Sequence, residues 1–74
     1  MSPRLPNLTP KQVHRTLLRA GFKEKRKIGS HIHLWHSNGR RTQVAMHSKD
    51  IKRGLLKAIL RQAGMEEDEF RKLL

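Results

Sequence analysis

Residues 31–46, HIHLWHSNGRRTQVAM, decide the fold that this sequence predicts. At their centre, Asn38-Gly39 is a strong signal for a β-hairpin, because both central residues of a type I′ turn need a positive φ. On each side of this pair, apolar residues alternate with polar ones, which is the period of a half-buried strand. The stretch therefore predicts two antiparallel strands joined by a tight turn.

A third strand is expected directly before this hairpin. Residues 22–28 also alternate with a period of two, and Gly29-Ser30 interrupts the run. The apolar residues at the two ends of this strand predict that its core side is the one with Phe22, Glu24, Arg26 and Ile28. The predicted core face of the three-stranded meander comprises Ile28, Ile32, Leu34, Val44 and Met46. The predicted open face carries Lys23, Lys25, Lys27, His31, His33, Trp35, Arg41 and Gln43.

A helix over residues 10–20 is predicted before the strands. Thr9 can cap this helix, and Gln12 follows at the spacing of a capping box. Gly21 comes next, where a left-handed helix stop favours glycine. Residues 1–8, which include two prolines, are expected to form an irregular lead-in.

The last third of the sequence is expected to be helical. Apolar residues recur at helical spacing through residues 51–63, and Ser48 or Asp50 could cap a helix that includes all of them. Gly54 is a poor residue for a helix interior. It favours the alternative of a loose turn at 49–53 followed by a helix over residues 55–63.

A short final helix is expected from Glu66, because the acidic run over residues 66–69 suits the positive end of a helix dipole. The whole order is α-β-β-β-α with a short C-terminal helix, in a single domain of residues 1–74. Two helices can cover one face of a three-stranded antiparallel sheet and leave the other face open. The sequence thus predicts an α+β fold whose open face carries the histidines, the tryptophan and the lysines.

The charge of the chain predicts a polyanionic partner. Seventeen Lys and Arg stand against six Asp and Glu, a net charge of +11, and residues 1–65 carry fifteen basic and only two acidic side chains, a net charge of +13. A soluble basic surface without a ligand is the competing interpretation. The absence of cysteine excludes disulfides and thiolate metal sites and fits a reducing cytosol. Neither a signal peptide nor a membrane span is predicted.

His31 is the residue best suited to chemistry on the predicted open face. An imidazole can accept or donate a proton near neutral pH. Metal-independent RNA cleavage needs a base for the 2′-hydroxyl and an acid for the leaving 5′-oxygen, with cations to stabilise the charge on the phosphorus oxygens. A histidine directly after Gly29-Ser30, beside a lysine-rich strand, meets these requirements. The competing interpretation is a surface histidine with no function.

Two other interpretations concern the neighbours of His31. His31 and His33 share one side of a strand, which is also an arrangement of zinc ligands, but a strongly positive field opposes a divalent cation. Only Glu24 supplies a carboxylate nearby in sequence. Trp35 could be packed at the sheet edge, stack on a nucleic-acid base or contact a protein partner.

Several short motifs occur in a fixed order along residues 9–70. They are Leu18-Arg19-Ala20-Gly21-Phe22, Gly29-Ser30-His31, His36-Ser37-Asn38-Gly39-Arg40, His47-Ser48-Lys49, Lys52-Arg53-Gly54-Leu55 and Ile59-Leu60-Arg61-Gln62-Ala63-Gly64, with an acidic tail leading to Phe70. In this order and spacing they resemble the HicA family of bacterial mRNA-interferase toxins, the YcfA-like small proteins. One departure is Ala45, where the family often has proline two residues before the later histidine.

The resemblance implies a fold like the double-stranded-RNA-binding domain, ribosome-independent cleavage of mRNA in the cytoplasm, and inhibition by a HicB-type antitoxin. It also implies that His31 is catalytic. His47 either supports the phosphate site or only ends a strand, and the structural interpretation is the favoured one. Gly29 and Ser30 are expected to shape the loop of His31, and no cofactor, metal or membrane is expected to take part. The expected RNA-binding residues are Lys23, Lys25, Lys27, His33, Trp35 and Arg41. The alternative is a non-catalytic RNA-binding module of the same fold.

Overall fold

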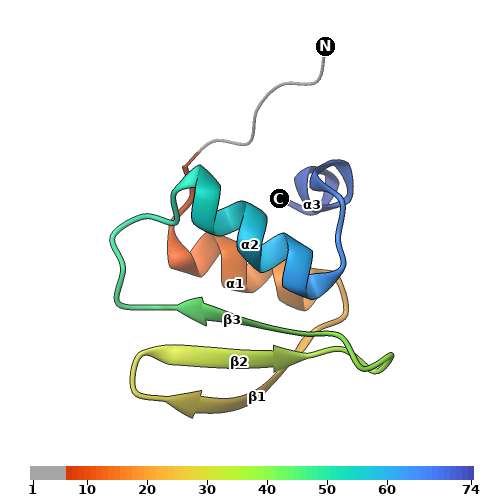
Figure 1. Cartoon of the computed structure of the whole chain (residues 1–74), viewed down its shortest axis with the longest axis horizontal. Coiled ribbons are helices and arrows are strands. Elements are labelled where there is room, and N and C mark those ends of the chain that lie inside the picture. The colour runs from red at the N-terminus through yellow and green to blue at the C-terminus, as the bar shows by residue number, and fades with distance from the viewer. Residues whose placement is uncertain (1–6) are drawn as a thin grey trace.

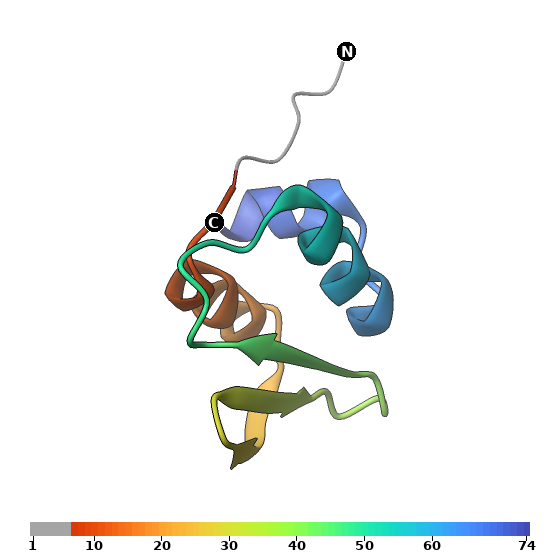
Figure 2. The same ribbon diagram turned by 60° about the vertical axis from the view of Figure 1, so that its left-hand side comes forward.

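The expected order of helices and strands is confirmed in the computed structural model, which describes residues 7–74. The strands form one antiparallel sheet in the order β1-β2-β3. The three helices gather on one side of this sheet (Figure 1), and a turned view shows its other face without a helix (Figure 2). The elements are α1 (Pro10–Arg19), β1 (Lys23–Ile28), β2 (His31–Trp35), β3 (Arg41–Ala45), α2 (Arg53–Ala63) and α3 (Glu67–Leu73).

The hydrophobic core lies between the sheet and the helices. The expected core side of β2 and β3 is confirmed: Ile32, Leu34 and Val44 are buried, and Met46 packs against them partly buried. Each helix contributes buried apolar side chains to the core. They are Val13 and Leu17 of α1, Leu56, Ile59, Leu60 and Ala63 of α2, and Phe70 of α3.

A β-bulge interrupts the regular alternation of β1. Glu24 pairs with Leu34 of β2. Arg26, two residues later, pairs with His33, the direct neighbour of Leu34, so Lys25 is an extra residue in the ladder. Such an insertion inverts the side-chain alternation of every residue that follows it.

The bulge contradicts the expected placement of the second half of β1. Directly paired residues of an antiparallel sheet share a face. Arg26 and Ile28 pair with His33 and His31, so they lie on the open face, and Ile28 is 55% exposed rather than part of the core. Lys27 pairs with buried Ile32 and therefore lies on the helix side, not on the open face. Because every residue of β1 is exposed, burial does not fix the register of this strand.

The hairpin between β2 and β3 is present, but its turn is not the expected type I′. That turn needs a positive φ at both Asn38 and Gly39, and only Gly39, with a φ of +94°, has one. The Gly39 N–H donates to the His36 carbonyl at 2.9 Å, and the His36 N–H donates to the Arg40 carbonyl at 2.8 Å. The loop therefore has three residues, 37–39, and the glycine provides the left-handed position at its end.

The helix starts confirm two expectations about capping. Thr9 caps α1: its hydroxyl accepts from the Gln12 N–H at 3.2 Å, and Gln12 Oε1 accepts from the Thr9 N–H at 2.9 Å. Glu66 occupies the same position before α3, and Glu69 Oε1 accepts from its N–H at 3.0 Å. The acidic run at the start of α3 therefore has the structural role expected of it.

The start of α2 differs from both expectations. The helix begins at Arg53 with Lys52 in the cap position, so neither Ser48 nor Asp50 caps it, and it starts before residue 55. Gly54 accordingly lies in the first turn of the helix and does not break it.

Ile51 belongs to the core but not to α2. Its N–H donates to the Leu8 carbonyl at 2.6 Å, and its carbonyl accepts from the Leu8 N–H at 3.3 Å. This bridge buries both side chains and ties the last residues of the lead-in to the loop after β3. Leu55, which shares the spacing of Ile51 and Ile59, is 46% exposed. The rest of the expected lead-in, residues 1–6, lies outside the described residues.

Arg40 fastens the tip of the β2–β3 hairpin to the end of α2. Its Nη1 donates to the carbonyl oxygens of Ala63 at 2.9 Å and Gly64 at 3.1 Å, and its Nε donates to Asn38 Oδ1 at 3.1 Å. Its guanidinium carbon also lies 5.6 Å from the centroid of the Phe22 ring. Gly64 has a φ of +65°, and a Cβ there would lie 2.8 Å from Arg40 Cδ. Glycine is therefore needed here both for the helix stop and for the close approach of the arginine.

Replacing Arg40 by alanine is expected to lower the free energy of unfolding by about 1.5–3 kcal/mol, because hydrogen bonds to a charged donor contribute roughly that much. Arg15→Ala, which removes an exposed guanidinium from α1, is the matched control and is expected to change stability by less than about 0.5 kcal/mol. Urea unfolding of the three proteins measures both values. Equal unfolding midpoints for Arg40→Ala and Arg15→Ala would contradict the structural role of Arg40.

Candidate functional site

A two-residue turn holds His31 at a corner of the sheet. Gly29 and Ser30 join β1 to β2, and Gly29 has a φ of +58°, as the first central position of a type II′ hairpin turn requires. A Cβ on Gly29 would meet open space, so backbone conformation rather than crowding calls for glycine. His31 follows as the first residue of β2, exposed to solvent and paired with Ile28 and Ala45.

A second histidine lies beside His31. The Met46 N–H donates to the Ser30 carbonyl at 2.7 Å, which extends the pairing of β2 with β3 beyond Ala45. His47 comes next, and its ring centroid lies 5.8 Å from that of His31, with the ring planes tilted by 59°. Both side chains are exposed. A ligand from solvent can therefore approach both rings.

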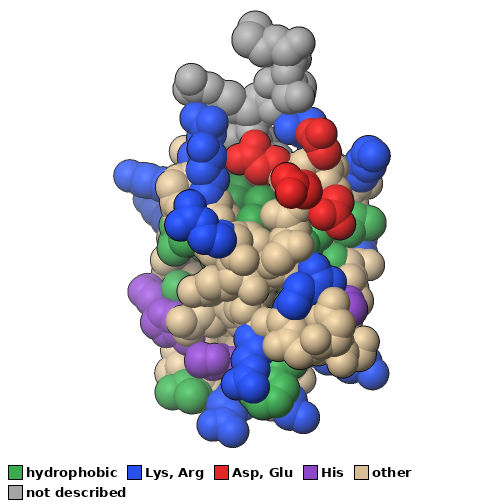
Figure 3. All heavy atoms as spheres, turned by 45° about the vertical axis from the view of Figure 1, so that its right-hand side comes forward, with side chains coloured by type: hydrophobic (Ala, Val, Ile, Leu, Met, Phe, Trp, Pro, Cys, Tyr) green, Lys and Arg blue, Asp and Glu red, His purple; other side chains and the backbone are tan. Residues whose placement is uncertain are grey.

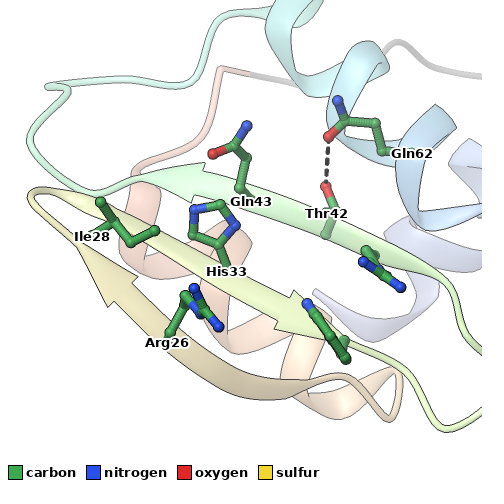
Figure 4. Close-up of a pocket in the computed structure, with 8 residues that line it drawn as sticks. Arg26, Ile28, His33, Thr42, Gln43 and Gln62 are labelled. Atoms are coloured by element: carbon green, nitrogen blue, oxygen red, sulfur yellow. Dashed lines mark hydrogen bonds between the residues drawn. The ribbon is translucent and has the colours of Figure 1, made fainter.

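An open groove of about 530 Å³ crosses the uncovered face of the sheet; we name it the arginine groove. In Figure 4, Arg26, Ile28, His33 and Gln43 project from the same face, and Gln62 lies beyond β3 on α2. Two guanidinium groups can bind phosphate, and amide side chains can hydrogen-bond base edges. The groove is lined by Arg26, Ile28, His33, Trp35, Arg41, Thr42, Gln43 and Gln62.

A smaller groove of about 200 Å³ lies between β3 and α2; we name it the histidine groove. Gln43 and Gln62 line both grooves, so the two adjoin. The Thr42 hydroxyl lies 3.1 Å from the Ile59 carbonyl and 3.2 Å from Gln62 Oε1, and these contacts hold α2 against the sheet beside the two grooves. A ligand in the arginine groove can thus continue past the two glutamines to His31. The histidine groove is lined by His31, Gln43, Ala45, Leu55, Ala58, Ile59 and Gln62.

Trp35 lies between two cations on the open face. Lys25 Nζ lies 5.3 Å from the centroid of the Trp35 ring, and Arg41 Cζ lies 4.2 Å from it. Lys25 comes from β1 and Arg41 from β3, the two neighbours of β2, so the cations approach the indole from both flanks. Attraction between a cation and an aromatic ring holds such groups in place. The indole thus orients two cations of the open face.

The carboxylates of β1 and α3 lie away from this face. Glu24 Oε1 lies 3.1 Å from His14 Nε2, on the helix side of the sheet. The acidic side chains visible in Figure 3 gather at one end of the molecule, and the histidines lie toward the other end. In the described residues 7–74, no three His, Asp or Glu side chains form a group that could hold a metal ion. The cations and imidazoles of the open face are therefore not neutralised by these carboxylates.

Comparison with known protein families gives a match that covers this whole arrangement. The model of the HicA toxin of bacterial toxin-antitoxin systems matches residues 10–65, from the start of α1 to just beyond α2. The chain belongs to the HicA toxin family. It is therefore the toxin of a toxin-antitoxin system, and its partner is an antitoxin. A comparison with curated proteins found no match.

In this HicA-family toxin, most of the residues predicted for the site do lie on one face. Lys27 is the exception, since the bulge turns it to the helix side. The structure gives positions and not roles, so the assignments to catalysis and RNA binding stay predictions. The residues that lie together are His31, His33 and Trp35 of β2, Lys23 and Lys25 of β1, and Arg41 of β3, with Gly29 and Ser30 in the adjacent turn.

Apart from Gln43, which the sequence places on the open face, three residues of the candidate site are not predicted from the sequence as part of it. His47 could have been found by extending the pairing of His31 with Ala45 by two residues, which places it on the same face. Arg26 was assigned to the core side, and no sequence signal marks the bulge that moves it. Gln62 comes from a helix far along the chain, so its approach to the groove needs the folded structure. In residues 7–74, no helix has the length and apolar character needed to cross a membrane.

Proposed function

We propose that this HicA-family toxin is an endoribonuclease that cleaves mRNA in the cytoplasm without the ribosome and without a metal ion. The observation that carries the proposal is the exposed His31, which lies on the uncovered face of the sheet and lines the histidine groove, next to the arginine groove with its two cations. An imidazole titrates near neutral pH and serves as general acid or base. His31 is the residue that we assign to proton transfer.

The proposed reaction uses the 2′-hydroxyl of the RNA as the nucleophile. A base removes the hydroxyl proton, the 2′-oxygen attacks phosphorus, and the bond from phosphorus to the 5′-oxygen breaks. The products are a 2′,3′-cyclic phosphate and, once the leaving oxygen gains a proton, a 5′-hydroxyl. Cations stabilise the charge that develops on the phosphorus oxygens. Arg26, which pairs with His33 two residues from His31, is the described cation that we assign to this role. Lys23, Lys25 and Arg41 lie around Trp35, further along β2, and we assign them to binding the RNA backbone away from the cleaved bond.

The RNA is proposed to lie along the arginine groove and to reach His31 past the two glutamines. His33 lines this groove and Trp35 holds Lys25 and Arg41 at its rim. In this arrangement Trp35 contributes to RNA binding through the cations that it orients. Gly29 and Ser30 shape the turn that presents His31 to the phosphate.

The antitoxin of this system is proposed to be a HicB-type protein that covers the same face. The net charge of +13 that the sequence carries over residues 1–65 favours a partner that presents acidic groups. Neutralising the acidic surface of the antitoxin is expected to weaken the complex and to reduce its salt dependence. Unchanged affinity and salt dependence would contradict this part of the proposal.

The test of the function is cleavage of a labelled RNA by the purified protein in the presence of a chelator. A matched oligonucleotide with 2′-deoxyribose at every position serves as the control substrate. The RNA is expected to be cleaved and the control to stay intact, because only RNA carries the nucleophile. RNA that is bound with a steep salt dependence but never cleaved would indicate the non-catalytic RNA-binding module instead.

The bulge in β1 gives a prediction about RNA affinity with a control one residue away. Arg26→Gln is expected to weaken RNA binding and to lower the slope of log affinity against log salt by about 0.7, the value for one phosphate contact with single-stranded RNA. Lys27→Gln removes the same charge from the same exposed strand but from its helix side, so its effect is expected to be smaller. A salt titration of binding measures both. A larger loss of RNA affinity for Lys27→Gln than for Arg26→Gln would contradict the assigned register of β1 against β2.

A further inference from the structure

From the position of the His47 ring, we propose that this histidine is the second proton-transfer group of the site and works with His31 on one phosphodiester. This inference rests on the proposed ribonuclease function and adds a catalytic residue to it. Cleavage by the 2′-hydroxyl moves two protons, one from the nucleophile and one to the leaving oxygen. A single imidazole that remains in one place cannot lie next to both oxygens at once, because they are on opposite sides of phosphorus in an in-line displacement.

The geometry of the pair suits this division of work. The ring centroids of His31 and His47 lie 5.8 Å apart, a separation that lets one phosphate contact a nitrogen of each ring within a hydrogen-bond reach of about 2.6–3.2 Å. The hydrogen bond from Met46 N–H to the Ser30 carbonyl, 2.7 Å long, joins the residues that directly precede the two histidines. The backbone thus fixes the spacing of the pair.

A purely structural role for His47 explains the arrangement less well. Both imidazoles are exposed, and a contact between two exposed rings buries little apolar surface. If both rings carry a proton, their charges repel. The hydrophobic core does not include His47, and its neighbour Met46 already packs against that core.

A metal site is also a weaker explanation of the pair. Two imidazoles need at least one more ligand to hold zinc in its usual protein coordination. In residues 7–74 no third His, Asp or Glu side chain joins them in a metal-binding group. The nearby arginines and lysines of the open face favour a phosphate over a divalent cation.

The proposed step balances with these two groups alone. The neutral imidazole accepts the 2′-hydroxyl proton while the 2′-oxygen forms its bond to phosphorus. The imidazolium donates its proton to the 5′-oxygen as the bond from phosphorus to that oxygen breaks. The pair ends with its protonation reversed, and exchange with water restores it.

The experiment compares wild type, His31→Ala and His47→Ala on two substrates in the presence of a chelator. The first substrate is RNA. The second is an oligonucleotide that ends in a nucleoside 3′-(4-nitrophenyl phosphate), whose nitrophenolate leaves without needing a proton. Ser48→Ala, one residue further along the same loop, is the control for disturbance of the loop, and thermal unfolding checks that each variant folds.

Both histidine variants are expected to cleave RNA about 10²–10⁴-fold more slowly than wild type, and Ser48→Ala is expected to stay close to it. On the nitrophenyl substrate, one of the two histidine variants should recover most of the lost rate, which identifies the general acid. A folded His47→Ala variant that cleaves RNA at the wild-type rate would overturn the inference and leave the proposed function standing. The same conclusion would follow if both histidine variants cleaved the nitrophenyl substrate as slowly as they cleave RNA. A wild type that cleaves neither substrate would overturn the proposed function itself.

Discussion

RNA cleavage by the His31→Ala variant is expected to fall by about 10²–10⁴-fold, the usual contribution of a general acid or base. The side chain is exposed, and its replacement leaves the buried residues of β2 in place, so the fold is expected to survive. RNA affinity is expected to change little, because the cations of the arginine groove are intact. Expression of the wild-type toxin without its antitoxin should arrest growth of the host, and expression of the variant should not.

His33→Ala provides the comparison for this prediction. His33 lies two residues further along the same strand and lines the arginine groove rather than the histidine groove. We expect its replacement to weaken RNA binding and to leave the cleavage rate at saturating RNA much closer to that of wild type. If instead His33→Ala lost the cleavage rate and His31→Ala kept it, the assignment of the catalytic residue would be wrong.

Leu34→Ala is expected to lower the free energy of unfolding by about 2–5 kcal/mol, as for other large-to-small substitutions in a core. Leu34 is 0% exposed and lies on β2, the central strand of the sheet, facing the helices. A domain of this size has a net stability of only roughly 3–5 kcal/mol. The variant should therefore be largely unfolded at physiological temperature, which circular dichroism and thermal unfolding can measure.

Leu55→Ala makes the same chemical change at a residue that shares the helical spacing of the buried Ile51 and Ile59 but is itself exposed. Leu55 is 46% exposed on the first turns of α2. Its replacement is expected to change stability by less than about 0.5 kcal/mol. Equal destabilisation by the two leucine variants would contradict the described packing of α2.

The elements of this fold are predictable wherever burial or local backbone chemistry marks them. Alternation in β2 and β3 identifies the buried face, because Ile32, Leu34 and Val44 all point into the core. The Asn38-Gly39 pair marks the hairpin, although the turn is not the predicted type I′, because only Gly39 has a positive φ. Thr9 marks the start of α1 through a capping box that the structure contains. These signals are local, so they can be read from the sequence without knowledge of tertiary contacts.

The features that the sequence does not predict depend on contacts between distant residues, or lie on a strand that has no buried side chain. The basic strand β1 has no buried side chain, so nothing in its pattern marks the bulge at Lys25. Ile51 looks like the first member of a helical stripe, but its bridge with Leu8 takes it out of the helix. The neighbouring positions of His31 and His47 follow from the pairing of His31 with Ala45, a register that only the folded sheet defines.

The chemical ends of the RNA fragments, determined in the presence of a chelator, test the central claim most directly. That claim is that His31 promotes attack by the 2′-hydroxyl without a metal ion. The account predicts a 2′,3′-cyclic phosphate on the upstream fragment and a 5′-hydroxyl on the downstream fragment, with both products lost in His31→Ala. Fragments that carry a 5′-phosphate and a 3′-hydroxyl, or cleavage that stops when the chelator is added, would contradict it.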